Sequence, residues 1–206
     1  MKNIVNLFKM VQATRGITLI GWALRGISKD QQSNLAEHHY LVTFISWRLA
    51  LLAKKSGGII DVQKVLEISL IHDLGETLGG DIPMPYGRKF PKARELAKAY
   101  EEHNQMYITS LFDDEEPYVK ELFEEANAQT TDEGLVAKIG DYLELYHYLF
   151  FLQKLSEKDI TFIDVSLQGL SNKIHDKKTK LVIQNFLKNW KDEIIGKNVI
   201  DIISGE

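Results

Sequence analysis

The chain has 206 residues, of which 44% are hydrophobic and 26% are charged, and its formal net charge is −4. This length and composition fit one soluble globular domain and exclude an intrinsically disordered chain. The absence of cysteine excludes disulfides and cysteine nucleophiles, so any metal site must use His, Asp and Glu. The slightly acidic balance argues against duplex nucleic acid as a partner, because surfaces that bind it are strongly basic.

The sequence contains neither a membrane span nor a signal peptide that we can identify. No apolar run approaches the length of about 20 residues that a membrane-spanning helix needs. The first ten residues, MKNIVNLFKM, lack the long apolar region and the small-residue cleavage site of a signal peptide. We therefore expect a cytoplasmic protein that does not bind membranes.

Apolar periodicity predicts helices in the first half of the chain. Only four prolines are present, and three of them fall within residues 83–91. Residues 34–55 have apolar positions three and four residues apart and end at a Ser-Gly-Gly sequence, which predicts a first long helix. Asp61 is the expected N-cap of a second helix, which includes residues 64–78 and stops at a Gly-Gly pair.

The second half is also predicted to be helical. The prolines of residues 81–91 indicate a loop, and residues 92–112 then form a long helix with a polar face, followed by a short helix after Pro117. Thr131 or Asp132 is the expected N-cap of a central helix rich in leucine and aromatic residues. The stretch ITFIDVSLQGL fits a helix or a strand, whereas KLVIQNFLKNWKDEII is an amphipathic helix.

These elements predict an all-α protein. We find no internal repeat and no low-complexity tract in the sequence. The expected organisation is a single helical domain over residues 1–206, with a motif-bearing core at about 15–150 and a C-terminal helical extension at about 155–206.

Several ionisable residues lie on the predicted helices, where burial without a partner is costly. They are Glu37, His38 and His39; His72, Asp73, Glu76 and Asp81; Asp141; and His147. On the predicted second helix, His72 and Glu76 are one turn apart and share a face. Imidazole nitrogens and carboxylate oxygens are common ligands of divalent first-row metals. Two further ligands from other helices would complete a site around His72 and Asp73.

Each of these residues also has an ordinary structural explanation. A single His on an apolar helix is more often a satisfied core residue than a ligand. Asp141 could be a helix-interior carboxylate paired with Lys138, and Glu37 could simply be solvated. The combination favours a metal site, because a His early in one helix, an adjacent His-Asp pair and a later helical Asp occur together.

This combination resembles the H…HD…D signature of the HD-domain metal-dependent phosphohydrolases. In the branch that contains the 5'-deoxynucleotidases, a Trp and an Arg precede the first His, and the pair continues as HDxxE…GDxxxP. This chain has GWALRG at residues 21–26, AEH at residues 36–38 and HDLGETLGGDIPMP at residues 72–85. The resemblance covers roughly residues 15–150 and implies a helical bundle of the HD-domain type.

The resemblance assigns roles residue by residue. It implies four metal ligands, which are His38, His72, Asp73 and Asp141. Glu76 matches the acidic residue that acts on the attacking water, and Asp81 matches the aspartate near the sugar and phosphate. His39 is read as a residue beside the ligands or as a structural one.

The phosphate-binding part of the motif departs from the family pattern. Arg25 is expected to hold the phosphate through its guanidinium group. Trp22 either packs in the core or faces the nucleotide. Some family members have Arg directly before this Trp, where the present chain has Gly21. Phosphate recognition therefore rests on Arg25, with Arg15, Arg88 or Lys89 as additional cations.

The resemblance implies a metal-dependent phosphomonoesterase that hydrolyses (deoxy)nucleoside 5'-monophosphates to nucleoside and phosphate. The cofactor would be a divalent ion, with Mn, Co, Mg, Fe and Zn all compatible, and the protein would be a homodimer. The alternatives are an HD phosphohydrolase acting on a nucleoside triphosphate or a signalling nucleotide, a non-catalytic nucleotide-binding scaffold, and a purely structural bundle. Thr77 after Glu76 argues against the (p)ppGpp hydrolases, which carry HDxxED.

Overall fold

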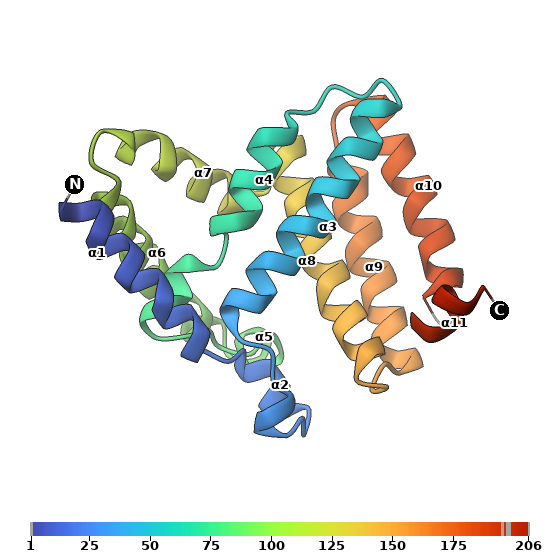
Figure 1. Ribbon diagram of the computed structural model, residues 1–206, viewed down its shortest axis with the longest axis horizontal. Helices are drawn as coiled ribbons and strands as arrows, with labels where there is room; N and C mark the ends of the chain where they lie inside the picture. The colour runs from blue at the N-terminus through green and yellow to red at the C-terminus, as the bar shows by residue number, and fades with distance from the viewer. Residues whose placement is uncertain (1, 195, 197–198, 206) are drawn as a thin grey trace. The chain divides into compact units, whose positions relative to one another are not determined.

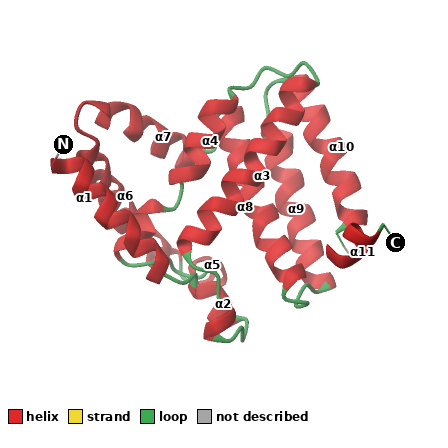
Figure 2. Ribbon diagram, in the orientation of Figure 1, coloured by secondary structure: helices red, strands yellow, loops and turns green. Residues whose placement is uncertain are grey.

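The computed structural model describes residues 2–194, 196 and 199–205, and these residues confirm the expected all-α fold. Figures 1 and 2 show a chain of helices joined by short loops, and the only β-type pairing in the described ranges is an isolated bridge between Thr18 and Asn34. The α-helices are α1 (Lys2–Val11), α2 (Ile20–Leu24), α3 (Leu35–Lys55), α4 (Val62–Ile71), α5 (Met84–Lys89), α6 (Pro91–Thr109), α7 (Glu116–Ala128), α8 (Asp132–Phe151), α9 (Glu157–Lys173), α10 (Lys177–Glu193) and α11 (Val199–Ser204). Short 3₁₀ helices are η1 (Gln12–Gly16), η2 (Lys29–Gln31), η3 (Leu74–Leu78) and η4 (Ser110–Glu115). None of the described helices has the length and apolar content needed to cross a membrane.

The chain forms two compact units. The first comprises Met1–Leu41 with Leu70–Asn127, and the second comprises Val42–Ser69 with Ala128–Glu206. In the first unit, α6 packs against η3, η4 and α5, and α1 packs against η1 and η4. The buried apolar residues of this unit include Trp22, Leu35, Ile108, Leu111, Val119, Leu122 and Phe123.

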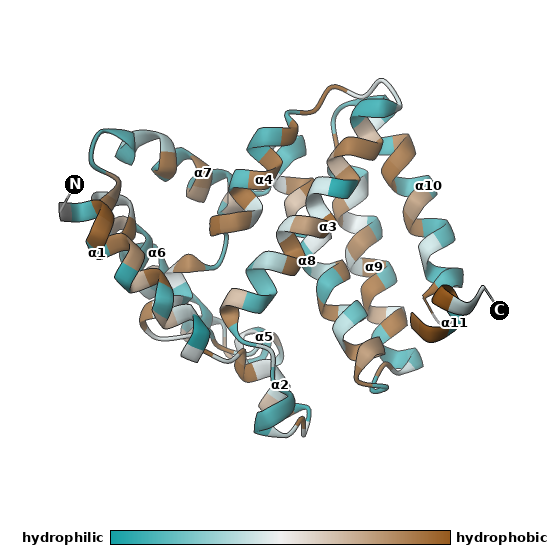
Figure 3. Ribbon diagram, in the orientation of Figure 1, coloured by the Kyte–Doolittle hydropathy of each residue, from teal (hydrophilic) through white to brown (hydrophobic). Residues whose placement is uncertain are grey.

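In the second unit α9 lies between α8 and α10 (Figure 1). Helix α10 carries both apolar and polar residues along its length (Figure 3). Its buried residues Ile183, Leu187 and Trp190 are three or four positions apart, so they lie on one face of the helix. Helices α3 and α8 approach closely at Gly140, where a Cβ atom would lie 2.0 Å from the Oγ atom of Ser46. The glycine before Asp141 therefore permits a contact that any side chain would prevent.

Helix ends confirm two expected caps and settle one open alternative. Asp61 accepts hydrogen bonds from the backbone N–H groups of Gln63 and Lys64, and Thr131 caps α8. The stretch ITFIDVSLQGL is helical in α9, because a capping box between Ser156 and Asp159 starts a helix just before its β-branched residues.

Two predicted boundaries were wrong. The second helix ends at Ile71, and a turn at His72 and Asp73 leads into η3, so His72 and Glu76 do not share one helical face. Leucines at positions 74 and 78 continue the apolar pattern past this break and conceal it. The proline-rich loop contains the short helix α5, because Pro85 lies in its first turn, where the missing N–H group costs nothing.

Candidate metal centre

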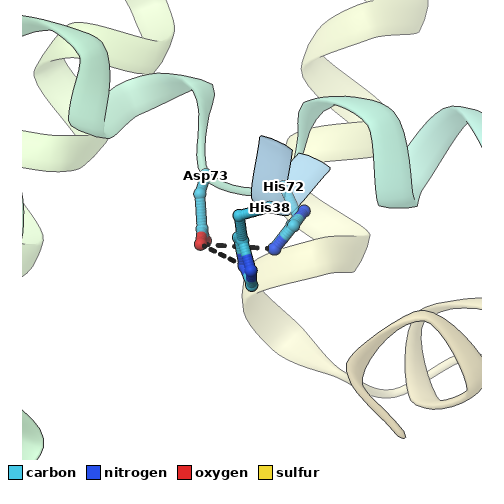
Figure 4. Close-up of side chains that lie close together, drawn as sticks. All are labelled: His38, His72 and Asp73. Carbon is cyan, nitrogen blue, oxygen red and sulfur yellow. Dashed lines mark ion pairs between the residues drawn. The ribbon is translucent and has the colours of Figure 1, made fainter. Parts of the chain in front are cut away.

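Three residues predicted as metal ligands lie together in the first unit. His38 comes from the first turns of α3, and His72 and Asp73 form the turn between α4 and η3. The Asp73 Oδ2 atom lies 3.2 Å from His72 Nε2 and 3.5 Å from His38 Nε2 (Figure 4). One ligand atom from each of these residues lies within 4.8 Å of the other two. Two imidazole nitrogens and a carboxylate oxygen this close together are a suitable donor set for one divalent cation.

The cluster is buried on its histidine side and more open at its carboxylate. His38 and His72 are 4% and 8% exposed, whereas the Asp73 side chain is 22% exposed. His39, which follows His38 on α3, is also buried, and its ring centroid lies 5.2 Å from that of His72. The third histidine therefore packs against the ligand rings, and the solvent reaches the cluster at Asp73.

Glu76 is held in η3 close to the cluster, and this residue is 9% exposed. Burial is the main reason why the pKa of Glu76 is raised from 4.5 to about 10, and the negative charges of Asp73, Asp81 and Glu101 add to this effect. His38 acts in the opposite direction. A bound cation would lower this pKa, because an opposite charge favours the ionised carboxylate. The excess of negative charge around Glu76 therefore fits a site built for a cation.

Asp81 follows η3 in an exposed position. Its Oδ1 atom accepts a hydrogen bond from the backbone N–H of Ile82 at 2.6 Å, which is the turn-stabilising arrangement of an Asp in a loop. Its charge also raises the pKa of Glu76, so Asp81 shares the electrostatic environment of the cluster.

The two residues expected to bind the phosphate and the nucleotide lie on or next to α2. Arg25 follows the last residue of this helix and is exposed. Trp22 is only 2% exposed, so its indole belongs to the core of the first unit. This burial favours the packing role for Trp22 over the nucleotide-facing role.

Asp141 and His147 lie on α8 in the second unit. The Asp141 carboxylate pairs with the Lys138 ammonium group one turn earlier, as the structural alternative anticipated. His147 accepts a hydrogen bond at Nε2 from the Trp190 indole N–H at 2.9 Å, and burial lowers its pKa. His147 thus connects α8 and α10.

The contacts between α6 and η3 were not predicted from the sequence. Tyr100, Glu101 and Asn104 face η3, and Asn104 is buried although the helix is mostly polar. These contacts join residues more than 20 positions apart, so local periodicity carries no signal for them. A buried Asn in a polar-faced helix can be distinguished from a solvated one only once the fold is known.

The raised pKa of Glu76 predicts that the metal-free protein loses stability as the pH rises. A carboxyl group with a raised folded-state pKa stabilises the fold fully below its unfolded-state pKa, and this stabilisation is lost as the pH rises toward the folded-state value. Between about pH 5 and pH 9 the Tm of the metal-free wild type should therefore fall by about 4 °C or more relative to Glu76→Gln, which cannot ionise. Thermal unfolding followed by circular dichroism tests this, and parallel pH profiles for the two proteins would contradict it.

Comparison with known proteins identifies the family. Residues 21–182 match the HD domain family. A 5'-deoxynucleotidase of Vibrio cholerae is 30% identical over 145 residues, which cover 66% of this chain and 68% of that protein. An HD-domain phosphohydrolase from Listeria innocua has a TM-score of 0.71 at 21% identity, covering 95% of this chain and 90% of that one. A cyanophage S-2L HD phosphohydrolase bound to dA and one catalytic Zn²⁺ has a TM-score of 0.50 at 19% identity, covering 79% and 85%. The chain therefore belongs to the HD-domain family and is a phosphohydrolase.

Proposed function

We propose that this protein is a metal-dependent phosphomonoesterase that hydrolyses (deoxy)nucleoside 5'-monophosphates to nucleoside and phosphate. The observation that carries the proposal is the cluster of His38, His72 and Asp73 with Glu76 beside it. A relative at 30% identity is named a 5'-deoxynucleotidase, and a structural neighbour binds dA and one catalytic Zn²⁺, which supports a deoxynucleotide substrate.

A divalent ion is proposed to bind the Nε2 atoms of both histidines and the Oδ2 atom of Asp73. The sequence motif alone adds Asp141 as the fourth ligand. Zinc is the favoured ion because the cyanophage protein carries it, while Mn, Co, Mg and Fe accept the same donor types. When bound, such an ion lowers the pKa of a water molecule and compensates charge on the phosphate.

The remaining residues supply proton transfer and binding. Glu76 is proposed to accept the proton of the attacking water while the water oxygen forms a bond to phosphorus. The bond between phosphorus and the 5'-oxygen breaks, and the leaving oxygen takes up a proton. Asp81 is assigned to this proton or to a sugar hydroxyl, and Arg25 to the phosphate oxygens through its fork of N–H donors. Trp22 would support Arg25 from the core side of α2.

The proposal also includes a homodimer in the cytoplasm. The dimer rests on the family resemblance. The apolar stretch YLELYHYLFF of α8 gives it little further support, because Leu143, Tyr146 and Leu149 are buried within the protein and are not available to a partner. Size-exclusion chromatography with light scattering measures this directly.

A substrate panel tests the proposed reaction. Protein reconstituted with each of the five divalent ions is incubated with deoxy- and ribonucleoside mono-, di- and triphosphates, and the released phosphate is measured beside Glu76→Ala. We expect release from monophosphates by the wild type and a much slower release by Glu76→Ala. Release from none of the monophosphates would refute the proposal, and release of pyrophosphate or triphosphate from a nucleoside triphosphate would support the alternative substrate class.

The role of Asp141 can be separated from its ion pair with Lys138. If Asp141 is a ligand, Asp141→Asn should weaken ion binding by about 100-fold or more, whereas Lys138→Met should leave it nearly unchanged. If the carboxylate only serves the ion pair, neither change should weaken ion binding. Each should then lower only the stability of the fold, and only slightly, because a partly exposed pair at this helical spacing contributes about 0.3 to 0.5 kcal/mol. Isothermal titration calorimetry of both variants with Zn²⁺ distinguishes these outcomes.

A further inference from the structure

Helix α6 holds both ends of the short segment that carries Glu76. The Tyr100 hydroxyl donates a hydrogen bond to the Leu78 carbonyl at 2.6 Å, and the Asn104 Nδ2 donates to the Gly75 carbonyl at 2.9 Å. Tyr100 and Asn104 are four residues apart on α6, so they lie on the same face of that helix. Their acceptors lie on either side of Glu76 in the chain, and the segment between them is therefore fastened at two points.

The backbone of this segment touches α6 directly. A Cβ atom at Gly75 would lie 2.9 Å from the Cγ atoms of Glu101 and Gln105, and one at Gly79 would lie 2.6 Å from Cε1 of Tyr100. Both distances are shorter than a carbon–carbon contact allows, so a side chain at either position would force these α6 side chains to shift. The two glycines thus bring η3 within reach of the hydrogen-bond donors on α6.

Electrostatics alone would not hold the Glu76 carboxylate in place. The three neighbouring carboxyl groups that act on it, those of Asp73, Asp81 and Glu101, all disfavour its charge, and His38 alone opposes them. In the metal-free protein these three charges disfavour the ionised Glu76 carboxylate. The backbone of η3, which α6 holds at Gly75 and Leu78, therefore contributes to its position.

We infer that Asn104, assisted by Tyr100, is a positioning residue that acts through Glu76. This inference rests on the proposed function, because it assigns Glu76 the task of accepting the proton of the attacking water. We expect Asn104 to contribute more to the position of Glu76 than Tyr100 does. Asn104 is 5% exposed, and its loss leaves the buried Gly75 carbonyl without its donor. Tyr100 is 50% exposed, so water can replace its hydroxyl group. Small displacements of a catalytic group lower the rate of the chemical step, so the loss of Asn104 or Tyr100 should lower kcat.

Asn104→Ala and Tyr100→Phe test the inference, with Asn127→Ala as the matched control. The Asn127 Nδ2 also donates a 2.9 Å hydrogen bond in the first unit, but to the Gln105 side chain and not to η3. With dAMP as substrate, Asn104→Ala should lower kcat by about tenfold to 100-fold with KM changed less than about twofold, and Tyr100→Phe by about threefold. Asn127→Ala should keep the wild-type kcat, and all three should keep the wild-type content of bound ion.

A double-mutant cycle separates positioning from general destabilisation. In the Glu76→Ala background, Asn104→Ala should cause no further loss of kcat, because the group that it positions is absent. An equal loss in both backgrounds, or a wild-type kcat for Asn104→Ala, would overturn the inference. If Asn104→Ala fails to fold, Tyr100→Phe removes only a hydroxyl group from a half-exposed ring and carries the same test.

Hydrogen exchange distinguishes failure of this inference from failure of the proposed function. If the wild type releases no phosphate from any monophosphate, the proposed function fails, and amide exchange over residues 74–80 still reports whether α6 holds the segment. Faster exchange there in Asn104→Ala than in Asn127→Ala supports the positioning role. Equal protection in the two variants would overturn it, whatever the activity.

Discussion

Replacing His72 with alanine is expected to remove the divalent ion and to leave the helical fold intact. His72 Nε2 lies 3.2 Å from the Asp73 Oδ2 atom, so its loss removes one of the three donors that the turn and α3 bring together. The affinity for the ion should fall by more than about 100-fold. Mutation of a residue that only hydrogen-bonds to a metal ligand already lowers metal affinity about 10-fold to 100-fold, and His72 is itself a proposed ligand. Zinc content after dialysis and the far-ultraviolet circular dichroism spectrum measure both parts of this expectation.

His39→Asn is the matched control for this experiment. His39 is buried beside the same rings and lies next to His38 on α3, but it is not one of the three clustered donors. We expect it to retain one ion per chain at saturating zinc. Retention of the ion with unchanged affinity by His72→Ala, with the fold intact, would show that this cluster is not the metal centre.

Glu76→Gln is expected to reduce phosphate release by about 10²-fold to 10⁴-fold while the ion remains bound. The amide has the same shape as the carboxylate but accepts no proton from water. Glu76 is three residues beyond Asp73 and outside the clustered donor set, so ion content should match the wild type.

Glu101→Gln supplies the control for charge near Glu76. Glu101 is another acidic residue whose charge raises the pKa of Glu76, but it lies on α6, where Gln105 donates a hydrogen bond to it. Its neutralisation should change kcat by less than about tenfold. A kcat for Glu76→Gln within tenfold of the wild type would exclude Glu76 as the group that accepts the proton.

The resemblance to the family motif was enough to select the three donors that cluster in the structure. His38 lies 34 positions before His72, and the structure places both side chains close to Asp73, although their role as metal ligands stays a prediction. The pairing of Asp141 with Lys138 was also foreseeable, because the two residues are three positions apart on one helix. Such features depend on local geometry or on a recognisable motif.

The support around Glu76 was not predictable in the same way. The apolar pattern continued through Leu74 and Leu78, so it gave no sign that α4 ends at Ile71 and that Glu76 sits in a 3₁₀ segment. The hydrogen bond from Asn104 to the Gly75 carbonyl spans 29 positions. A side chain that binds a distant backbone carbonyl leaves no periodic trace in the sequence, because its role depends on tertiary packing.

The most direct test of the metal-dependent reaction is phosphate release from dAMP by the same protein before and after removal of divalent ions. The protein is treated with a chelator, dialysed and then titrated with Zn²⁺, Mn²⁺ or Co²⁺, with His72→Ala in parallel. We expect release to disappear on chelation, to return with at least one ion in the wild type, and to remain absent in the variant. Undiminished release from the chelated wild type, or equal recovery in His72→Ala, would contradict a reaction that depends on this metal centre.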